Sequence, residues 1–279
     1  MDYSQFLAMH QEIGLLLVIL IVFLFDTFSS RQIPRGLSML SIVLFAVLTV
    51  FGFVCPVCNE SVSAFGGMYV ATPTMTAIKN ILNVGVLIVL IQSVSWADSE
   101  HMRIRRGEFY ELLLITLLGM YFMISARHFL LFIIGLETAS LPLAALVAFD
   151  KNRYESHEAA VKYILTAVFS SAVFMMGLSF VYGLSGTLYF ADIAASMAQG
   201  RAMLIVAVAF VIAGMGFKLS LVPFHMWTAD TYQGAPTAIT SYLSVISKGA
   251  AAFAFFVIMV QVFGPYYGRI WEWMLYALI

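Results

Sequence analysis

The sequence predicts an all-α fold, a polytopic helical membrane protein with eight complete transmembrane helices and the start of a ninth. Of its 279 residues, 62% are hydrophobic and only 10% are charged, whereas a soluble domain carries about 25% charged residues. Its mean hydropathy is +0.96. Apolar runs of about 20 residues recur along the chain, which is the length of a helix that crosses a bilayer. Because a lipid-embedded backbone must satisfy its own polar groups, these runs are expected to be helices.

The complete spans are expected near residues 12–29, 37–54, 76–96, 109–126, 129–149, 159–183, 202–227 and 237–263. The segment before the first run has no Lys or Arg and so lacks the basic region of a cleaved signal peptide, and we expect this run to be retained. The seventh span contains Pro223 and is predicted to be discontinuous. A ninth run opens at Arg269, and the chain stops inside it. A helix that enters a bilayer should also leave it, so we expect the chain to be a fragment of a longer protein.

The basic residues predict the orientation. With the N-terminus outside, the inner loops hold Arg31, Arg35, Arg103, Arg105, Arg106, Lys151 and Arg153, and the outer loops hold Arg127, Arg201 and Arg269. This asymmetry follows the positive-inside rule. The N-terminus is therefore expected on the outer side of the membrane. The net charge of −1 gives no indication of a nucleic-acid partner.

The two cysteines, Cys55 and Cys58, form a CPVC motif in a loop that is expected to be outside. A periplasmic position would permit a disulfide. The loop offers no histidine or second cysteine pair that could complete a zinc site. We expect a local disulfide or two free thiols, without a functional role.

The charged residues inside the predicted spans are mostly lysines. Every arginine falls in a loop or at a helix end, whereas Lys79, Lys162, Lys218 and Lys248 fall within spans. Arginine stays protonated, but a buried lysine can lose its proton. Desolvation favours the neutral amine and a nearby carboxylate favours the ammonium. The use of lysine therefore indicates groups that exchange protons rather than fixed charges. Lys79 lies close to the outer end of its span, which favours a snorkelling or packing role.

The carboxylate expected to partner these lysines is Glu137, near the middle of the fifth span. A charge at that depth is costly and requires a partner. Pro142 follows Glu137 by five residues, and Pro223 follows Lys218 by five. Each proline frees the carbonyl four residues before it. Open backbone within a membrane must be satisfied by protein or water, so hydrated pockets are predicted beside both charges.

Three further residues are candidates for a proton path. His225 lies seven residues after Lys218, on the same face if the helix continues, and histidine relays protons near neutral pH. Lys248 lies among serines and Tyr242 on a polar face that could hold water. Lys162 follows Glu158 by four residues, so its side chain could also extend to the inner surface. A capping histidine and a structural ion pair are the alternatives to these roles.

Three segments resemble a known family. FKLSLVPFHMWTADTYQGAPT, GLETASLPLAALVA and EAAVKYILTAVFSSAVFMMGLSFVYGLSGT look like the proton-translocating antiporter-like subunits of respiratory complex I. The resemblance covers roughly residues 105–263. It implies a first five-helix repeat at 105–263, an N-terminal three-helix segment at 1–104 and the start of a second repeat at 264–279.

The resemblance also implies roles for the charged residues. Glu137 and Lys218 would form an ion pair between the fifth and seventh helices, and Lys248 would be the central lysine of the eighth. Lys162 would be the sixth-helix lysine, and His225 would follow the break in the seventh helix. The implied activity is proton translocation coupled to electron transfer from NADH to quinone in other subunits.

The resemblance implies a bacterial inner membrane as the location, with a periplasmic N-terminus, and it implies partners as well. These are other membrane-arm subunits, namely the antiporter-like subunit M and the small subunits A, J and K, together with the lipid bilayer. NADH, FMN, iron–sulfur clusters and quinone would belong to partner subunits, since this sequence has no cysteine cluster and no nucleotide-binding motif.

Two alternatives remain at this stage. The same helices would suit a cation/proton antiporter or a membrane hydrogenase subunit. The buried charges would also suit a purely structural membrane subunit.

Overall fold

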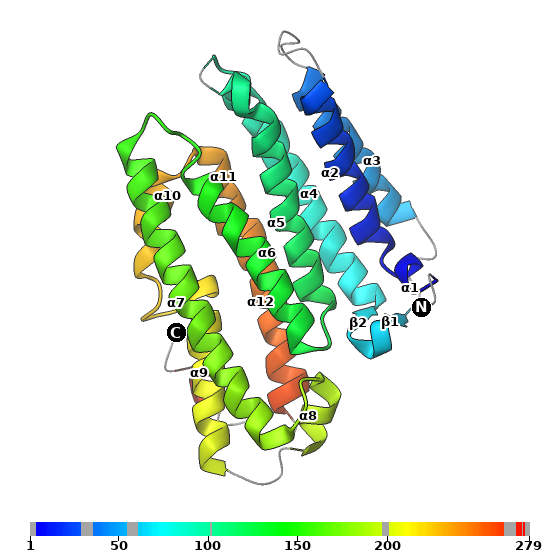
Figure 1. The fold of residues 1–279 in the computed structure, drawn as a ribbon, viewed down its shortest axis with the longest axis vertical. Helices are drawn as coiled ribbons and strands as arrows, with labels where there is room; N and C mark the ends of the chain where they lie inside the picture. Colours follow the sequence, from blue (N-terminus) through cyan, green and yellow to red (C-terminus); the bar gives the residue numbers. More distant parts are fainter. Residues whose placement is uncertain are drawn as a thin grey trace.

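The computed structural model describes residues 4–28, 36–54, 61–100, 102–196, 201–264, 272–274 and 276. Within these residues, seven helical segments are long and apolar enough to cross a membrane, and they run side by side (Figure 1). The first six contain α2 (His10–Phe28), α3 (Gly36–Val54), α4 (Pro73–Ala97), α5 (Arg106–Ser125, preceded by the 3-10 turn η3, Arg103–Arg105), α6 (Phe129–Val147) and α7 (Tyr154–Ser185). The seventh joins α11 (Thr237–Ser241), the π-helix η4 (Tyr242–Ser247), α12 (Lys248–Ile258) and the π-helix η5 (Met259–Phe263).

The expected count of eight complete spans is not reproduced within the described residues. The predicted span 202–227 is divided into α9 (Arg201–Leu219) and α10 (Met226–Gly234), and the apolar part of α9, Met203–Leu219, is shorter than the other spans. The break in this span is the discontinuity that Pro223 predicted. Only residues 272–274 and 276 of the ninth run are described. Cys55 and Cys58 lie outside the described residues, and so do several of the basic residues used to predict orientation.

A short β-hairpin that the sequence analysis did not predict lies near the N-terminus. Strands β1 (Val62–Ala64) and β2 (Tyr69–Ala71) pair antiparallel around the turn η2 (Phe65–Gly67). The turn needs the left-handed region, with φ of 65° at Gly66 and 86° at Gly67, and glycine adopts these values without a steric cost. The short helix α1 (Ser4–Leu7) contacts β1.

The hairpin ties together one end of the bundle, which we call the hairpin end. The amide of Arg127, between α5 and α6, donates to the carbonyl of Met68 at 2.9 Å. The amide of Phe190, where α8 (Phe190–Ser196) begins, donates to the carbonyl of Arg127 at 3.0 Å. The opposite end, which we call the basic end, carries the connections 98–105 and 148–153.

Helix α5 occupies the centre of the fold and packs against α2, α3, α4, α6 and α12. Its contact with α6 brings the two backbones together at glycines. A Cβ added to Gly119 would lie 2.4 Å from the amide nitrogen of Ala139, and one added to Gly135 would lie 2.7 Å from that of Met123. Only glycine allows this approach, so α5 and α6 are held in fixed register.

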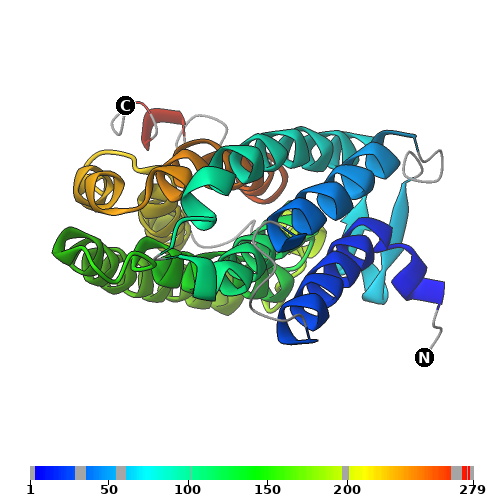
Figure 2. The same ribbon diagram turned by 90° about the horizontal axis from the view of Figure 1, so that it is seen from above.

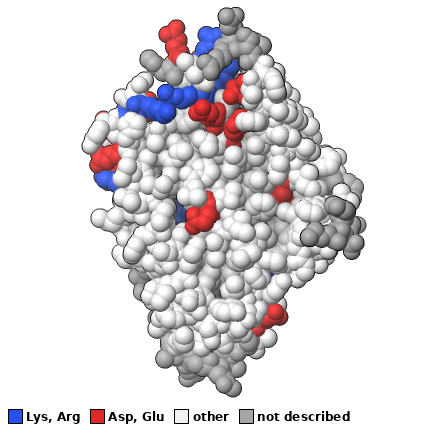
Figure 3. Space-filling view, in the orientation of Figure 1, with Lys and Arg blue, Asp and Glu red and all other residues white. Residues whose placement is uncertain are grey.

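The outer surface of the bundle is apolar. Large hydrophobic side chains remain exposed along α3 and α7, for example Val47 at 63% and Phe169 at 72%. Exposed apolar faces of this extent suit contact with lipid. On the face seen in Figure 3, charged side chains gather near the basic end. Figure 2 shows α2 and α3 on one side of the bundle and α7 and α10 on the other, so the structure has two well-separated regions in which buried charge can be placed.

Candidate functional site

The seventh predicted span is interrupted because α9 ends in a Schellman motif. The amide of Leu221 donates to the carbonyl of Gly216 at 2.8 Å, and the amide of Ser220 donates to the carbonyl of Phe217 at 3.0 Å. These are the two hydrogen bonds of the motif. Ser220 takes the left-handed conformation with φ of 58°. The helix therefore ends four residues before Pro223, and the proline follows the break rather than causing it.

Aromatic side chains fill the space at this break. The indole of Trp227 donates to the carbonyl of Phe217 at 3.1 Å, and the two rings lie 4.7 Å apart. Tyr163 from α7 packs against Trp227 with ring centroids 5.2 Å apart. The second half of the broken span is thus fixed by a satisfied carbonyl and by aromatic packing.

Lys218 lies in the last turn of α9 and its side chain points into the protein, with 5% of the residue exposed. The carboxyl end of a helix carries partial negative charge, which favours a cation at this position. The ammonium nitrogen donates to the hydroxyl of Ser140 on α6 at 2.8 Å. Ser140 in turn donates to the carbonyl of Leu136 at 2.7 Å. The break in α9 therefore places a lysine against α6.

Glu137 lies on α6 three residues before Ser140, but it does not form the predicted direct ion pair with Lys218. No ion pair between the two is found among the described residues. They are within electrostatic range of one another. The oxygen Oε1 of Glu137 is buried and has no hydrogen-bond partner among the described residues. Helix α6 continues past Pro142 to Val147, so this proline does not end its helix.

Several hydroxyl groups near this pair are also unsatisfied. In the part of the chain that the structure describes, the buried hydroxyls of Tyr163 and Tyr232 form no hydrogen bond of regular geometry, and Tyr163 is within electrostatic range of Glu137 and close to Ser140. Lys248, at the start of α12, holds its ammonium 5.1 Å from the centre of the Tyr232 ring. Buried polar groups without protein partners normally bind water. This geometry suits the hydrated pocket that the sequence predicted, and we call Glu137, Tyr163, Lys218, Tyr232 and Lys248 the central cluster.

Two of the predicted site residues lie away from the central cluster. His225 is exposed and directly precedes α10, so it does not share a continuous helix face with Lys218. Lys162 is also exposed, and its ammonium lies 2.6 Å from Asp230 Oδ2 on α10 and 2.7 Å from Glu158 Oε1. Lys162 therefore joins α7 to α10 at the surface.

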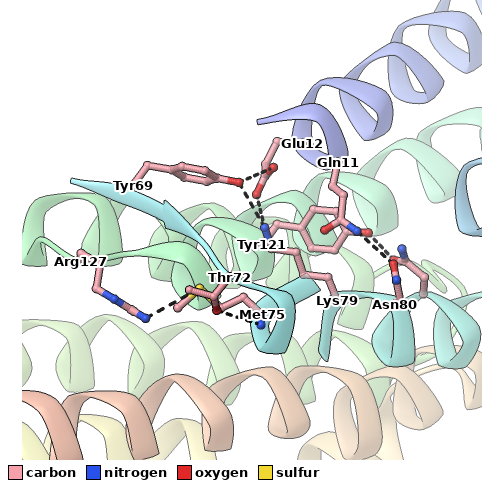
Figure 4. Close-up of polar contacts among 10 residues, drawn as sticks. Gln11, Glu12, Tyr69, Thr72, Met75, Lys79, Asn80, Tyr121 and Arg127 are labelled. Atoms are coloured by element: carbon pink, nitrogen blue, oxygen red, sulfur yellow. Dashed lines mark hydrogen bonds and ion pairs between the residues drawn. The ribbon is translucent and has the colours of Figure 1, made fainter. Parts of the chain in front are cut away.

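A buried ion pair that the sequence did not predict joins α2 to α4 at the hairpin end. Lys79 was assigned to the outer end of its span, but it is 2% exposed. Its ammonium lies 2.5 Å from Glu12 Oε1 on α2 (Figure 4). The sequence contained a signal for this pair. Glu12 and Lys79 carry opposite charges, and each lies at the N-terminal end of an apolar segment that begins at the hairpin end.

Two ionisable groups at the hairpin end lie between α5 and α6. Burial lowers the pKa of Arg127 to about 10, and its guanidinium borders a cavity of about 890 Å³ that Asp192 also lines. The Nδ1 atom of His128 accepts a hydrogen bond from the amide of Leu130 at 3.0 Å and so caps α6. Burial lowers the pKa of His128. A neutral imidazole is required for this cap, because only the neutral ring has an acceptor nitrogen.

No group of three or more His, Cys, Asp or Glu side chains that could hold a metal ion is present in the described part of the chain. The side chains at the central cluster are two amines, a carboxylate and two phenolic hydroxyls, all of which can hold or release a proton. Fold and site together define the class: an integral membrane protein whose buried charges surround a broken helix.

Within that class, the chain belongs to the NADH:quinone oxidoreductase/Mrp antiporter transmembrane family, whose model matches residues 126–279. Among its relatives are two proteins named NADH-quinone oxidoreductase subunit N. The one from Azobacteroides pseudotrichonymphae is 48% identical over 100% of this chain and 58% of its own length. The one from Phocaeicola vulgatus is 49% identical over 95% of this chain and 55% of its own length. The chain thus spans somewhat more than half the length of these relatives.

Solved structures show the same fold. A chain of respiratory complex I from Thermus thermophilus, solved with bound aureothin, superimposes with a TM-score of 0.72 at 27% identity, over 88% of this chain and 52% of that one. A chain of the archaeal membrane-bound sulfane sulfur reductase superimposes with a TM-score of 0.80 at 20% identity, over 98% and 57%. At the lower identity, the second match concerns the fold alone.

Proposed function

We propose that this chain acts in NADH-quinone oxidoreductase as its subunit N, in the membrane arm. There it moves protons while partner subunits transfer electrons from NADH to quinone. The names of the relatives support the assignment to this enzyme. The central cluster supports the activity.

The observation that carries the proposal is the separated arrangement of Lys218 and Glu137. A buried carboxylate oxygen without a hydrogen-bond donor is costly while the group is charged, and protonation removes that cost. Here Lys218 is held by the neutral Ser140 hydroxyl, and Glu137 Oε1 has no protein donor. This leaves the carboxylate able to accept a proton from water or from a neighbouring hydroxyl. The arrangement favours proton exchange over a purely structural role.

The remaining predicted site residues have places along the proposed path. Lys162 with Asp230 and Glu158 would provide an exposed, charged entrance on the basic-end side of the central cluster. Lys248 would receive the proton beyond Tyr232, because its ammonium faces that ring. His225, exposed beside the break, would exchange protons with a surface that a partner subunit or a further part of the protein covers.

The proposed assembly follows from the same assignment. NADH, FMN, iron–sulfur clusters and quinone would be held by partner subunits, and the neighbours in the membrane arm would include the antiporter-like subunit M and the small subunits A, J and K. The N-terminus, at the hairpin end, would face the periplasm. Residues 105–263 would form the first five-helix repeat, 1–104 the N-terminal segment and 264–279 the start of the second repeat.

The proposal is tested by Lys218→Met and Glu137→Gln in the full-length protein within the intact enzyme complex. NADH-driven proton uptake into inverted membrane vesicles and quinone reduction would be measured on the same preparations. Both should fall at least about tenfold, since positioned proton-transfer groups typically contribute that much or more.

The matched control is Lys151→Met, which removes an exposed lysine from the connection before α7. It should leave both measurements unchanged. Normal proton uptake and normal quinone reduction in Lys218→Met would refute the proposal. Co-purification of the tagged chain with an antiporter or sulfur-reducing assembly, in place of an NADH-oxidising one, would refute the assignment to this enzyme.

A further inference from the structure

A second buried charge cluster lies between α2, α4 and β2, at the hairpin end of the fold. Glu12 and Lys79 form an ion pair of 2.5 Å with side chains that are 3% and 2% exposed. The hydroxyl of Tyr69 donates to Glu12 Oε2 at 2.9 Å and lies 3.4 Å from the ammonium of Lys79, from which it accepts a hydrogen bond. Figure 4 shows the three side chains converging from separate elements.

Other polar groups surround this ion pair on every element that packs against it. From α5, the ring of Tyr121 lies 5.3 Å from the Lys79 ammonium, and its hydroxyl donates to Asn83 on α4. On α2, His10 is within electrostatic range of both charges, and its Nε2 atom is buried without a partner. The cluster therefore contains a buried acid, a buried base and two buried phenols, with the partly buried imidazole of His10 beside them.

Buried hydroxyl groups on α5 and η4 lie between this cluster and the central cluster. Thr116 is five residues before Tyr121 on α5, about 7.5 Å along the helix axis. Its hydroxyl donates to the hydroxyl of Tyr242 at 2.7 Å. Tyr242 is within electrostatic range of Tyr121 on one side and of Tyr163 on the other. Tyr163 belongs to the central cluster, so polar groups extend across an otherwise apolar core.

We propose that the Glu12–Lys79 pair is a second proton-holding site, connected to the central cluster through Tyr121, Thr116 and Tyr242. The inference rests on the proposed function, since it adds a site to the proton path. In the step that we propose, one N–H bond of the Lys79 ammonium breaks and an O–H bond forms on Glu12 Oε1. The N–H electron pair stays on nitrogen, which leaves a neutral amine and a neutral carboxylic acid.

The surroundings suit such a transfer. A short, direct contact between the two atoms provides the path for the proton, and burial brings the neutral pair closer in free energy to the charged pair. Tyr69 can hydrogen-bond to either state of Glu12, because a hydroxyl both donates and accepts. The neutral state of the pair would then pass a proton on when the charge at the central cluster changes.

The alternative is a structural ion pair that only fixes α2 against α4. The variant Lys79→Arg, in the full-length protein within the intact complex, distinguishes a proton-holding site from a structural ion pair. Arginine retains the positive charge but does not release its proton. Protons taken up per NADH oxidised would be measured in inverted vesicles, with complex content determined on native gels. Lys151→Arg, on the exposed connection, is the matched control.

We expect Lys79→Arg to assemble and to lower the protons moved per NADH by about tenfold, with Lys151→Arg unchanged. Wild-type pumping in Lys79→Arg, with pumping lost in Lys218→Met, would overturn this inference and leave the proposed function standing. Normal pumping in Lys218→Met would refute the proposed function itself.

A second measurement keeps the inference testable if Lys79→Arg does not assemble. The infrared difference spectrum between the resting and the NADH-reduced wild-type complex should contain a carbonyl band of a protonated carboxylic acid. That band should be absent from Glu12→Gln. A spectrum that is the same in Glu12→Gln as in the wild type would overturn the inference.

Discussion

The Glu12–Lys79 pair and the Glu137–Lys218 pair use the same two residue types in opposite ways. In the first, the charges touch at 2.5 Å and Tyr69 completes their hydrogen bonds. In the second, the charges are held apart, Lys218 is bound by Ser140, and Glu137 Oε1 has no protein partner. The helix break explains the difference, because the Schellman motif at Leu219 and the α6 backbone fix Lys218 and Glu137 separately.

The comparison teaches that the number of buried charges does not determine how a charged pair responds to substitution. The hydrogen bonds that each charge makes determine it. When two buried charges are in direct contact, removal of one side chain leaves the other charge buried without a counter-charge. A separated pair depends on hydroxyls and water, so a neutral replacement of the carboxylate removes little binding energy. The two regions should therefore respond differently to the same substitutions, and the following predictions are ordered from the largest expected effect to the smallest.

Lys79→Met should destabilise the purified protein by about 3–5 kcal/mol, because it leaves Glu12 buried without its counter-charge. Thermal unfolding in detergent micelles would measure the loss. The double variant Glu12→Gln with Lys79→Met should recover a large part of it, since no uncompensated charge remains. A single variant as stable as the wild type would show that Glu12 and Lys79 are not paired as described.

Gly119→Ala should cost about 1–3 kcal/mol, because the added methyl group would overlap the α6 backbone between the two charge clusters. The matched control is Gly183→Ala on α7, where the nearest atom to an added Cβ, Met203 Cε, is 3.8 Å away. That change should be neutral or slightly stabilising, since alanine is the better helix former. Equal effects at the two glycines would contradict the close approach of α5 and α6.

Glu137→Gln should change stability by less than about 1 kcal/mol, because Oε1 has no protein hydrogen bond to lose. The same change at Glu12 should cost several times more, because that carboxylate accepts from both Lys79 and Tyr69. Unfolding of the two variants in the same detergent gives the comparison directly. If Glu137→Gln cost more stability than Glu12→Gln, Glu137 would be the carboxylate held by protein hydrogen bonds, in contradiction to the structure.

The smallest effect concerns His128 at the start of α6. Burial lowers its pKa below the ordinary value of 6.5, so the unfolded chain binds more protons than the folded one as the pH falls through 6.5. The stabilising contribution is present above 6.5 and is lost as the pH falls through the lowered pKa. The protection factor of the Leu130 amide, which is its exchange rate relative to that of an unprotected amide at the same pH, should therefore fall at acidic pH. His128→Asn, which keeps a side-chain cap, should remove this pH dependence.

The sequence predicted the membrane class and most helices because long apolar runs have few alternatives in a bilayer. It also predicted the break near Pro223, but not its position, which depends on the left-handed conformation of Ser220. The hairpin at residues 62–71 escaped prediction because its strands are only three residues long. The sequence indicated five charged or titratable site residues, and the structure brings Glu137, Lys218 and Lys248 to one region.

The remaining site features depend on tertiary contacts that a linear pattern does not contain. The position of Lys79 near the end of its span suited either snorkelling or packing. Glu12 at the same end of another span was a signal of a pair, but only the fold shows that the two side chains touch. Likewise, Ser140 was an unremarked serine until α9 brought Lys218 against it. Tyr163 carries no sequence signal, since aromatic residues are common throughout this chain, and Tyr242 was indicated only as part of the polar face around Lys248.

The glycine contact between α5 and α6 has a mechanical consequence. At Gly119 and Gly135 the two backbones meet without an intervening side chain, so there is no rotamer that could change to absorb a displacement. Close-packed interfaces of this kind transmit strain rather than dissipate it. Helices α5 and α6 should therefore move together as one rigid unit, which carries Tyr121 on α5 and Glu137 on α6. A small rotation that alters the distance from Glu137 to Lys218 would also move Tyr121 against Lys79.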